Sequence, residues 1–309
     1  MSDDLEKLVA RAIRRRDGDD YDLVAIAEEA PERLTPHLTD LLAAGVAYPA
    51  TLFRSADTTA RRALVARVDA GDPADNLDHL LTALVQTVGP EVDEAFLRWR
   101  DTPPPQAGEL LVAPAEYLRE GGRELAGDGL RELCAPNGFQ LVAVDGALVP
   151  EDGTCQDCDG PLWTALQLDT ATPQVAEALA HTGWHGRLRV DVCHRCDFTA
   201  DVVYREVGPD GTCRPSAHSP SGVGEDMDPP TTHMVVGGPA GRFPGGSAVG
   251  GLPVWRDDAR YPSCPDCGRT MDYIAQIDLG DPWDDTYFDG RLTFFLHAGC
   301  GLAGMFAQG

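Results

Sequence analysis

Apolar residues recur at helical spacing through the first third of the chain. Within residues 5–13 they follow one another at intervals of three and four, which places them on one face of a helix. Similar patterns continue through five further segments, at residues 21–30, 37–44, 57–69, 76–88 and 91–100. Turn-forming pairs of glycine, aspartate, proline and glutamate separate these segments. We therefore predict an all-α region over residues 1–101, either a small HEAT-like helical repeat or a plain bundle.

Residues 102–138 connect this region to the rest of the chain. Residues 103–105 are three consecutive prolines, which form a stiff extended linker. Residues 115–135 then resemble one more helical segment. We assign the whole stretch to a proline-rich linker with a helical segment.

Short β-type runs replace the helical pattern from residue 139 onward. They read FQLVAV, LWTALQL, RLRVDV, TADVVYREV, MDYIAQI and RLTFFL. Residues 215–244 are rich in glycine and proline and predict a linker. That linker separates a first β-rich unit at 139–214 from a second at 245–309. The expected fold class is α+β with several domains.

Cysteine spacing suggests that the two β-rich units are copies of each other. In the first unit, Cys155 and Cys158 form a C-x-x-C pair, and in the second unit Cys264 and Cys267 do so. In both, glutamine follows the first cysteine by 12 positions and aspartate by 14. Further on, a Gly-Arg-Leu triplet precedes a second pair of residues by the same interval of seven from its glycine. That second pair is Cys193 and Cys196 in the first unit, and His297 and Cys300 in the second.

The histidine indicates the chemistry of this pattern. His297 stands where Cys193 stands, and zinc accepts either donor, whereas a disulfide could not tolerate the exchange. We therefore expect two zinc-ribbon-like sites, the first all-cysteine and the second with three cysteines and one histidine. Their ligands are Cys155, Cys158, Cys193 and Cys196 in the first site, and Cys264, Cys267, His297 and Cys300 in the second. Because all four positions of each zinc are filled by protein, we expect both ions to be structural. Cys134 and Cys213 have no counterpart in the repeat.

The charge balance limits the choice of partner. The chain has 309 residues with 50 acidic and 25 basic side chains, a formal net charge of −25. Such an excess disfavours nucleic acid, whose phosphates require a basic face. It reflects either the habit of a halophilic or GC-rich host or an acidic surface for a basic protein partner. The first residues show no apolar signal segment, and no apolar run is long enough to span a membrane, so we expect a cytoplasmic protein.

The second unit also resembles a known family. Residues 250–255 read GGLPVW, and CPDCG, QID and GRLTFF come after them. This pattern resembles the bacterial YwqG-like family and is similar to the C-terminal domain of the programmed-cell-death-protein-2 family. The resemblance implies a β-rich zinc module linked with immunity to toxins or with chaperoning, both of which are protein-binding roles.

We therefore expect a non-enzymatic zinc protein that acts as a protein-interaction module, with the helical region and residues 250–255 as contact surfaces. Motifs of zinc peptidases, zinc deaminases and phosphate-binding loops are missing from the sequence. One alternative is a hydrolase that uses acidic pairs between the β-rich units, such as Asp257 with Asp258 and Asp284 with Asp285. Another is a zinc protein that binds nucleic acid.

Overall fold

The computed structural model describes residues 2–150, 153–222, 228–255, 258–283 and 290–308. The chain divides into two compact units, Met1–Arg131 and Glu132–Gly309. One is mainly helical and the other mainly β-stranded, so the predicted α+β fold class is confirmed.

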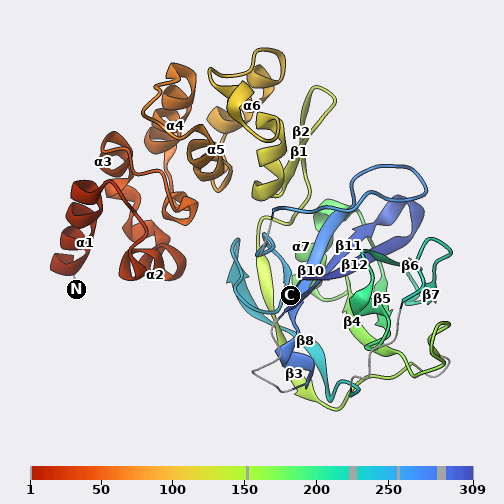
Figure 1. Ribbon diagram of the computed structural model, residues 1–309. Helices are drawn as coiled ribbons and strands as arrows, with labels where there is room; N and C mark the ends of the chain where they lie inside the picture. Colours follow the sequence, from red (N-terminus) through yellow and green to blue (C-terminus); the bar gives the residue numbers. More distant parts are fainter. Residues whose placement is uncertain (1, 151–152, 223–227, 256–257, 284–289, 309) are drawn as a thin grey trace. The chain divides into compact units, whose positions relative to one another are not determined.

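The helical unit contains the six predicted helices. They are α1 (Ser2–Arg15), α2 (Tyr21–Glu29), α3 (Leu38–Ala43), α4 (Thr58–Ala70), α5 (Leu77–Val85) and α6 (Pro90–Asp101). Three 3-10 turns lie between the helices, at Pro31–Arg33, Thr35–His37 and Ala50–Phe53, and two more follow α6, at Ala107–Glu109 and Pro114–Gly121. Helix α1 contacts α2 and α3, and α4 contacts α3, α5 and α6 (Figure 1). No helix in the described ranges is both long and apolar enough to cross a membrane.

Capping residues fix the ends of α4. At its start, the side chain of Asp57 accepts a hydrogen bond from the N–H of Ala60 at 2.9 Å. At its end, Gly71 adopts a left-handed conformation with φ of 59°. The amphipathic face between these caps buries Ala60, Leu64 and Val68 in the core of the unit.

The Asp57 cap leads to a first prediction. Replacing Asp57 with alanine should lower the stability of the helical unit by about 1 kcal/mol, because the N–H of Ala60 loses its partner. Urea unfolding followed by circular dichroism at 222 nm measures the change. The matched control is Glu29→Ala, which removes an exposed carboxylate at the end of α2. Equal stability of both variants would show that the cap contributes nothing.

Residues 115–135 differ from the predicted helical segment. After the 3-10 turn, they form a hairpin of β1 (Arg123–Ala126) and β2 (Gly129–Glu132). Gly127, with φ of 57°, and Asp128 make the two-residue turn, a sequence signal that favours tight hairpins over helix. Leu125 and Leu130 of this hairpin pack against the core of the helical unit.

The β-rich unit is built on one eight-stranded sheet of order β7-β6-β12-β11-β10-β9-β3-β8, in which every neighbouring pair is antiparallel. Its strands are β3 (Gly138–Asp145), β6 (Val203–Val207), β7 (Cys213–Pro215), β8 (Thr232–Gly241), β9 (Ala248–Gly250), β10 (Asp272–Asp278), β11 (Arg291–His297) and β12 (Leu302–Gln308). The hairpin of β4 (Trp163–Asp169) and β5 (Arg187–Val192) forms a separate sheet. Helices α7 (Pro173–Leu179) and α8 (Gly280–Trp283) and the 3-10 turns Ala180–Thr182, Asp197–Thr199 and Ala298–Cys300 complete the unit.

Both faces of the large sheet are buried around β11. Its residues alternate between two apolar clusters, with Phe294 and Leu296 in one and Phe295 in the other. The first cluster includes side chains of the β4–β5 hairpin and α7. The second includes side chains from residues 252–271. A strand buried on both faces reads as a continuous apolar run, which explains the sequence LTFFL.

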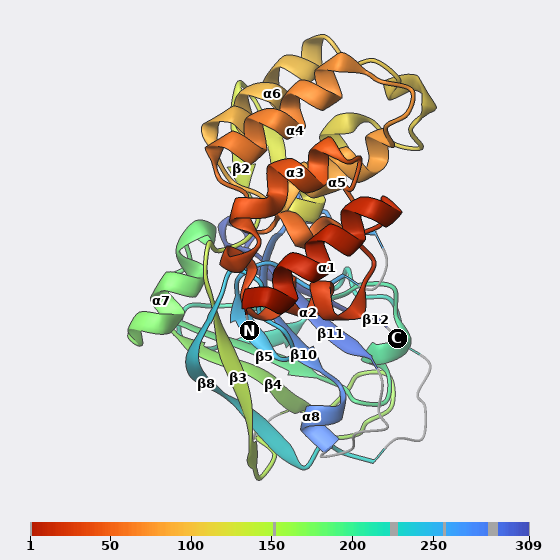
Figure 2. The same cartoon turned by 90° about the vertical axis from the view of Figure 1, so that its left-hand side faces the viewer.

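Part of the predicted linker over residues 215–244 is a strand. Residues Thr232–Gly241 form β8 and pair with β3, and the two lie side by side as long strands in Figure 2. Glycine and proline are tolerated there because β8 lies at the end of the strand order and the pairing contains bulges. Strands β6 and β12 also pair directly, so the segments predicted as two β-rich units contribute to one sheet.

Residues 250–255 are mostly too buried to form a contact surface. Residues 250–253 are buried, and the ring of Trp255 stacks on Phe295 and meets Tyr261 edge to face. In this stretch Val254 is the exposed apolar side chain, at 39%. The prediction that this segment forms a contact surface is wrong for its buried part, because the apolar side chains complete the core.

Candidate metal centres

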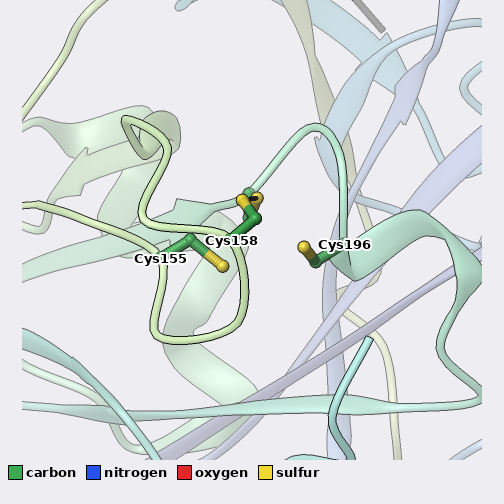
Figure 3. Close-up of side chains that lie close together, drawn as sticks. Cys155, Cys158 and Cys196 are labelled. Carbon is green, nitrogen blue, oxygen red and sulfur yellow. Dashed lines mark hydrogen bonds between the residues drawn. The ribbon is translucent and has the colours of Figure 1, made fainter. Parts of the chain in front are cut away.

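The structure brings the four cysteines of the first predicted site together. Cys155 and Cys158 lie on the turn before β4, and Cys193 and Cys196 lie on the loop after β5. Their sulfur atoms all lie within 4.8 Å of one another. Figure 3 shows Cys155 and Cys158 on one turn and Cys196 on the facing loop. This group could hold a metal ion.

The second predicted site is assembled in the same way. Cys264 and Cys267 lie on the turn before β10, His297 ends β11, and Cys300 lies in the following 3-10 turn. Their ligand atoms also lie within 4.8 Å of one another. Nε2 of His297 is 3.6 Å from Sγ of Cys267. Three thiols and one imidazole can therefore meet at one ion.

The two cysteine turns share their backbone geometry. The N–H of Cys155 donates to the carbonyl of Gly160 at 2.8 Å, and that of Cys264 donates to the carbonyl of Arg269 at 2.8 Å. The fourth residue after the first cysteine has a positive φ in both, 54° at Asp159 and 73° at Gly268. This tight turn aims two thiols in one direction, as a tetrahedral metal site requires.

Similarity extends into the hairpins that follow each turn. An ion pair joins their strands at the same register, Asp169 with Arg187 and Asp278 with Arg291. Each hairpin also contains one bulge, between Thr164 and Leu166 in β4 and between residues 273 and 275 in β10.

The matching glutamines have different environments. Gln276 is fully buried, and its side chain donates to the carbonyl of Gly246 at 2.7 Å and accepts from the N–H of Val254 at 3.0 Å. It thereby holds the glycine-rich loop against β10. Gln167, at the corresponding position of β4, is exposed.

Solvent exposure distinguishes the two groups. In the first, Cys158 is half-buried and the other three cysteines are buried, whereas in the second Cys267 is exposed. Burial raises the pKa of the Cys193 thiol to about 12. A backbone N–H of Arg269, and then its guanidinium, lower the pKa of Cys267 to about 7. Without a metal, burial therefore favours the neutral thiol of Cys193, and a cation would supply the charge that stabilises its thiolate.

A buried ion pair supports the loop of the first group. Asp197 accepts the N–H of Cys193 at 2.7 Å and forms an ion pair with Arg205 on β6. The guanidinium of Arg205 also donates to the carbonyl of Asp191 at 2.9 Å. Burial raises the pKa of Asp197, while the charge of Arg205 and the N–H of Cys193 oppose that rise. The sequence does not reveal this pair, because nothing in the spacing of Arg205 distinguishes it from exposed arginines.

Cys134 and Cys213 lie apart from the two groups. Sγ of Cys134 contacts the hydroxyl of Tyr261 at 3.1 Å, and Sγ of Cys213 accepts the N–H of Asp191 at 3.3 Å. Burial raises the pKa of each thiol to about 12, which makes both poor nucleophiles. Among the described residues, neither belongs to a group that could hold a metal.

The acidic pairs of the hydrolase alternative cannot be compared with the structure. Asp257, Asp284 and Asp285 lie outside the described residues.

Comparison with curated proteins identifies a similar sequence in Salmonella typhimurium, the uncharacterized protein YpfL, which is 31% identical over 270 residues. The match covers 80% of this chain and 62% of YpfL, so the chain spans less than two thirds of that relative's length. No protein-family model matches the chain, and no solved structure matches it. The name of YpfL states no activity, so the chemistry must be inferred from the residues themselves.

Proposed function

We propose that the chain binds two structural zinc ions. The observation that carries this proposal is the convergence of eight predicted ligands into two groups, each with four donor atoms within 4.8 Å of one another. Thiolate and imidazole are the donors that zinc prefers, and four of them complete its tetrahedron. A closed site of this kind leaves no position for a catalytic water. The ligands are Cys155, Cys158, Cys193 and Cys196 for the first ion, and Cys264, Cys267, His297 and Cys300 for the second.

The two sites belong, in our proposal, to copies of one duplicated unit. The shared cysteine turn, the positive φ at its fourth position, the cross-strand ion pair and the bulge all support this origin. Features such as a bulge at one register are set by backbone geometry, and a chance similarity of cysteine spacing would not reproduce them. This duplication and the YwqG-like pattern of the second unit both favour a zinc module that builds a scaffold.

At the level of the whole chain, we infer a protein-interaction module, of the immunity or chaperone kind, in a reducing cytoplasm. The net charge of −25 favours a basic partner and disfavours nucleic acid. A helical region with HEAT-like architecture would supply the contact surface. Purification of the tagged chain from its native host should recover a stoichiometric protein whose binding weakens with salt. Recovery of nucleic acid alone would contradict this role.

The difference in exposure predicts that the second ion is the first to leave. A chelator reaches Cys267, which is exposed, before it reaches the buried thiols around the first ion. Zinc release to a colour-forming chelator should therefore show a fast and a slow phase of equal size.

Variants that lack one site assign those two phases. Replacing Cys264 and Cys267 with serine should remove the fast phase, and replacing Cys155 and Cys158 should remove the slow one. The reverse assignment would show that exposure does not control release.

A further inference from the structure

One short segment connects the two cysteine turns. Residues 216–222 come after β7, and side chains from both turns hold the segment. Asp157, between Cys155 and Cys158, accepts the N–H of Gly222 at 3.1 Å. Asp266, between Cys264 and Cys267, contacts Nε2 of His218 at 2.9 Å. Both aspartates occupy the same position, two residues after the first cysteine of their turn.

The Gly222 end of this segment packs tightly against a predicted ligand. A Cβ at this position would lie 2.3 Å from the carbonyl oxygen of Cys196 and 2.8 Å from its Cβ. The backbone there can therefore approach only without a side chain. The loop that carries Cys196 and the turn that carries Asp157 meet the segment at one place.

Between its ends the segment is fixed to the large sheet. The hydroxyl of Ser219 donates to the carbonyl of Tyr204 at 2.6 Å and accepts the N–H of the same residue at 2.9 Å. Ser216 is buried, at 6% exposure. The segment is thus held by β6 at Ser219, by the second cysteine turn at His218 and by the first cysteine turn at Gly222.

We propose that residues 216–222 couple the two metal sites, so that zinc in one raises the affinity of the other; this rests on the proposed zinc binding. Zinc fixes the shape of a cysteine turn and thereby the position of its aspartate. With Asp266 in place, His218 is held, and the segment is already positioned for Gly222 to meet Asp157 and Cys196. The first ion then binds to a turn that is already partly ordered, so less conformational entropy is lost on binding. Because such coupling is reciprocal, zinc in the first site raises the affinity of the second site by the same factor.

The coupling is measured by zinc titration against a competing chelator. Two single-site chains are needed, one with Cys155 and Cys158 replaced by serine and the other with Cys264 and Cys267 replaced by serine. The coupling is a ratio: the product of the two zinc association constants of the wild type divided by the product of the association constants of the two single-site chains. His218→Ala should lower this ratio about fivefold, the low end of typical couplings, because the bond to Asp266 is half-exposed. The two single-site constants should stay unchanged in the His218→Ala background.

Two further variants make the test specific. Asp157→Ala cuts the other end of the segment and should lower the ratio by a similar factor. His185→Ala removes an exposed histidine elsewhere in the unit and should leave the ratio at its wild-type value.

The inference is overturned if His218→Ala keeps the wild-type ratio, or if it weakens the single-site constants as much as the product. Absence of zinc from the wild type would instead contradict the proposed function itself.

Discussion

Replacing Cys155 with serine should lower the zinc content to one ion per chain and destabilise the β-rich unit, while the helical unit remains folded. The first ion loses one of its four donors, and serine oxygen is a poor substitute for thiolate. A ligand at about 1,000 times its dissociation constant stabilises a fold by about 4 kcal/mol, so loss of one zinc removes much of the stability of a typical domain.

The stability of the helical unit should not change, because the helical unit has a separate hydrophobic core. The large buried cluster of that unit draws on residues 5–118. Elemental analysis of Cys155→Ser therefore counts the ions left in the β-rich unit. Limited proteolysis should show that the helical unit resists cleavage while the β-rich unit is cleaved more readily. Cys213→Ser is the matched control, since it removes a half-buried thiol of the same unit that lies outside both groups. Two ions in Cys155→Ser, or one in Cys213→Ser, would contradict the assignment of ligands.

Replacing Arg205 with methionine should destabilise the β-rich unit by about 3–5 kcal/mol, because removing one partner leaves the other charge buried without compensation. Asp197 and Arg205 side chains are 9% and 6% exposed. The same change frees the carboxylate that holds the N–H of Cys193, so the first zinc should also bind more weakly. Urea unfolding and chelator competition measure the two effects.

Arg187→Met is the matched control for this experiment. Arg187 pairs with Asp169 across the β4–β5 hairpin, but its side chain is 69% exposed. Exposed ion pairs contribute less than about 1 kcal/mol, so the stability should change little. Similar losses in both variants would show that burial of the Arg205 pair is not the cause.

Helices and candidate metal ligands can be predicted from the sequence because their signals lie within short segments. Each of the six helices has an apolar face within its own residues, and α4 carries both of its caps. The candidate ligands are found by comparing the residue spacing of two segments of one chain. This comparison requires no knowledge of the fold. His297 is included because of its place in that comparison, and the structure brings it to Cys264, Cys267 and Cys300.

Features that depend on distant partners cannot be predicted in this way. Gly237, Gly238 and Pro239 suggest a loop at the position of strand β8, yet pairing with β3 orders it. Strand β12 shows no clear alternation, because it is buried on both faces next to β11. Arg205 is one of 24 arginines in the sequence, and only the fold selects it for burial beside Asp197.

The way the cysteine turns are held suggests a structural role for bound metal ions. In our proposal each group uses all four of its donors to bind zinc, and residues 216–222 contact both cysteine turns. Zinc in this protein would therefore act on the rigidity of the scaffold, and recognition of a partner would fall to surfaces away from the ions.

Native mass spectrometry of the purified 309-residue chain tests the central claim most directly. Sprayed from a volatile neutral buffer, the protein should carry the mass of two zinc ions. Treatment with acid and chelator should remove both ions, and the charge-state distribution should then change to that of a chain whose β-rich unit is unfolded. A chain that carries iron, a single metal ion, or no metal while its β-rich unit remains folded would contradict the account.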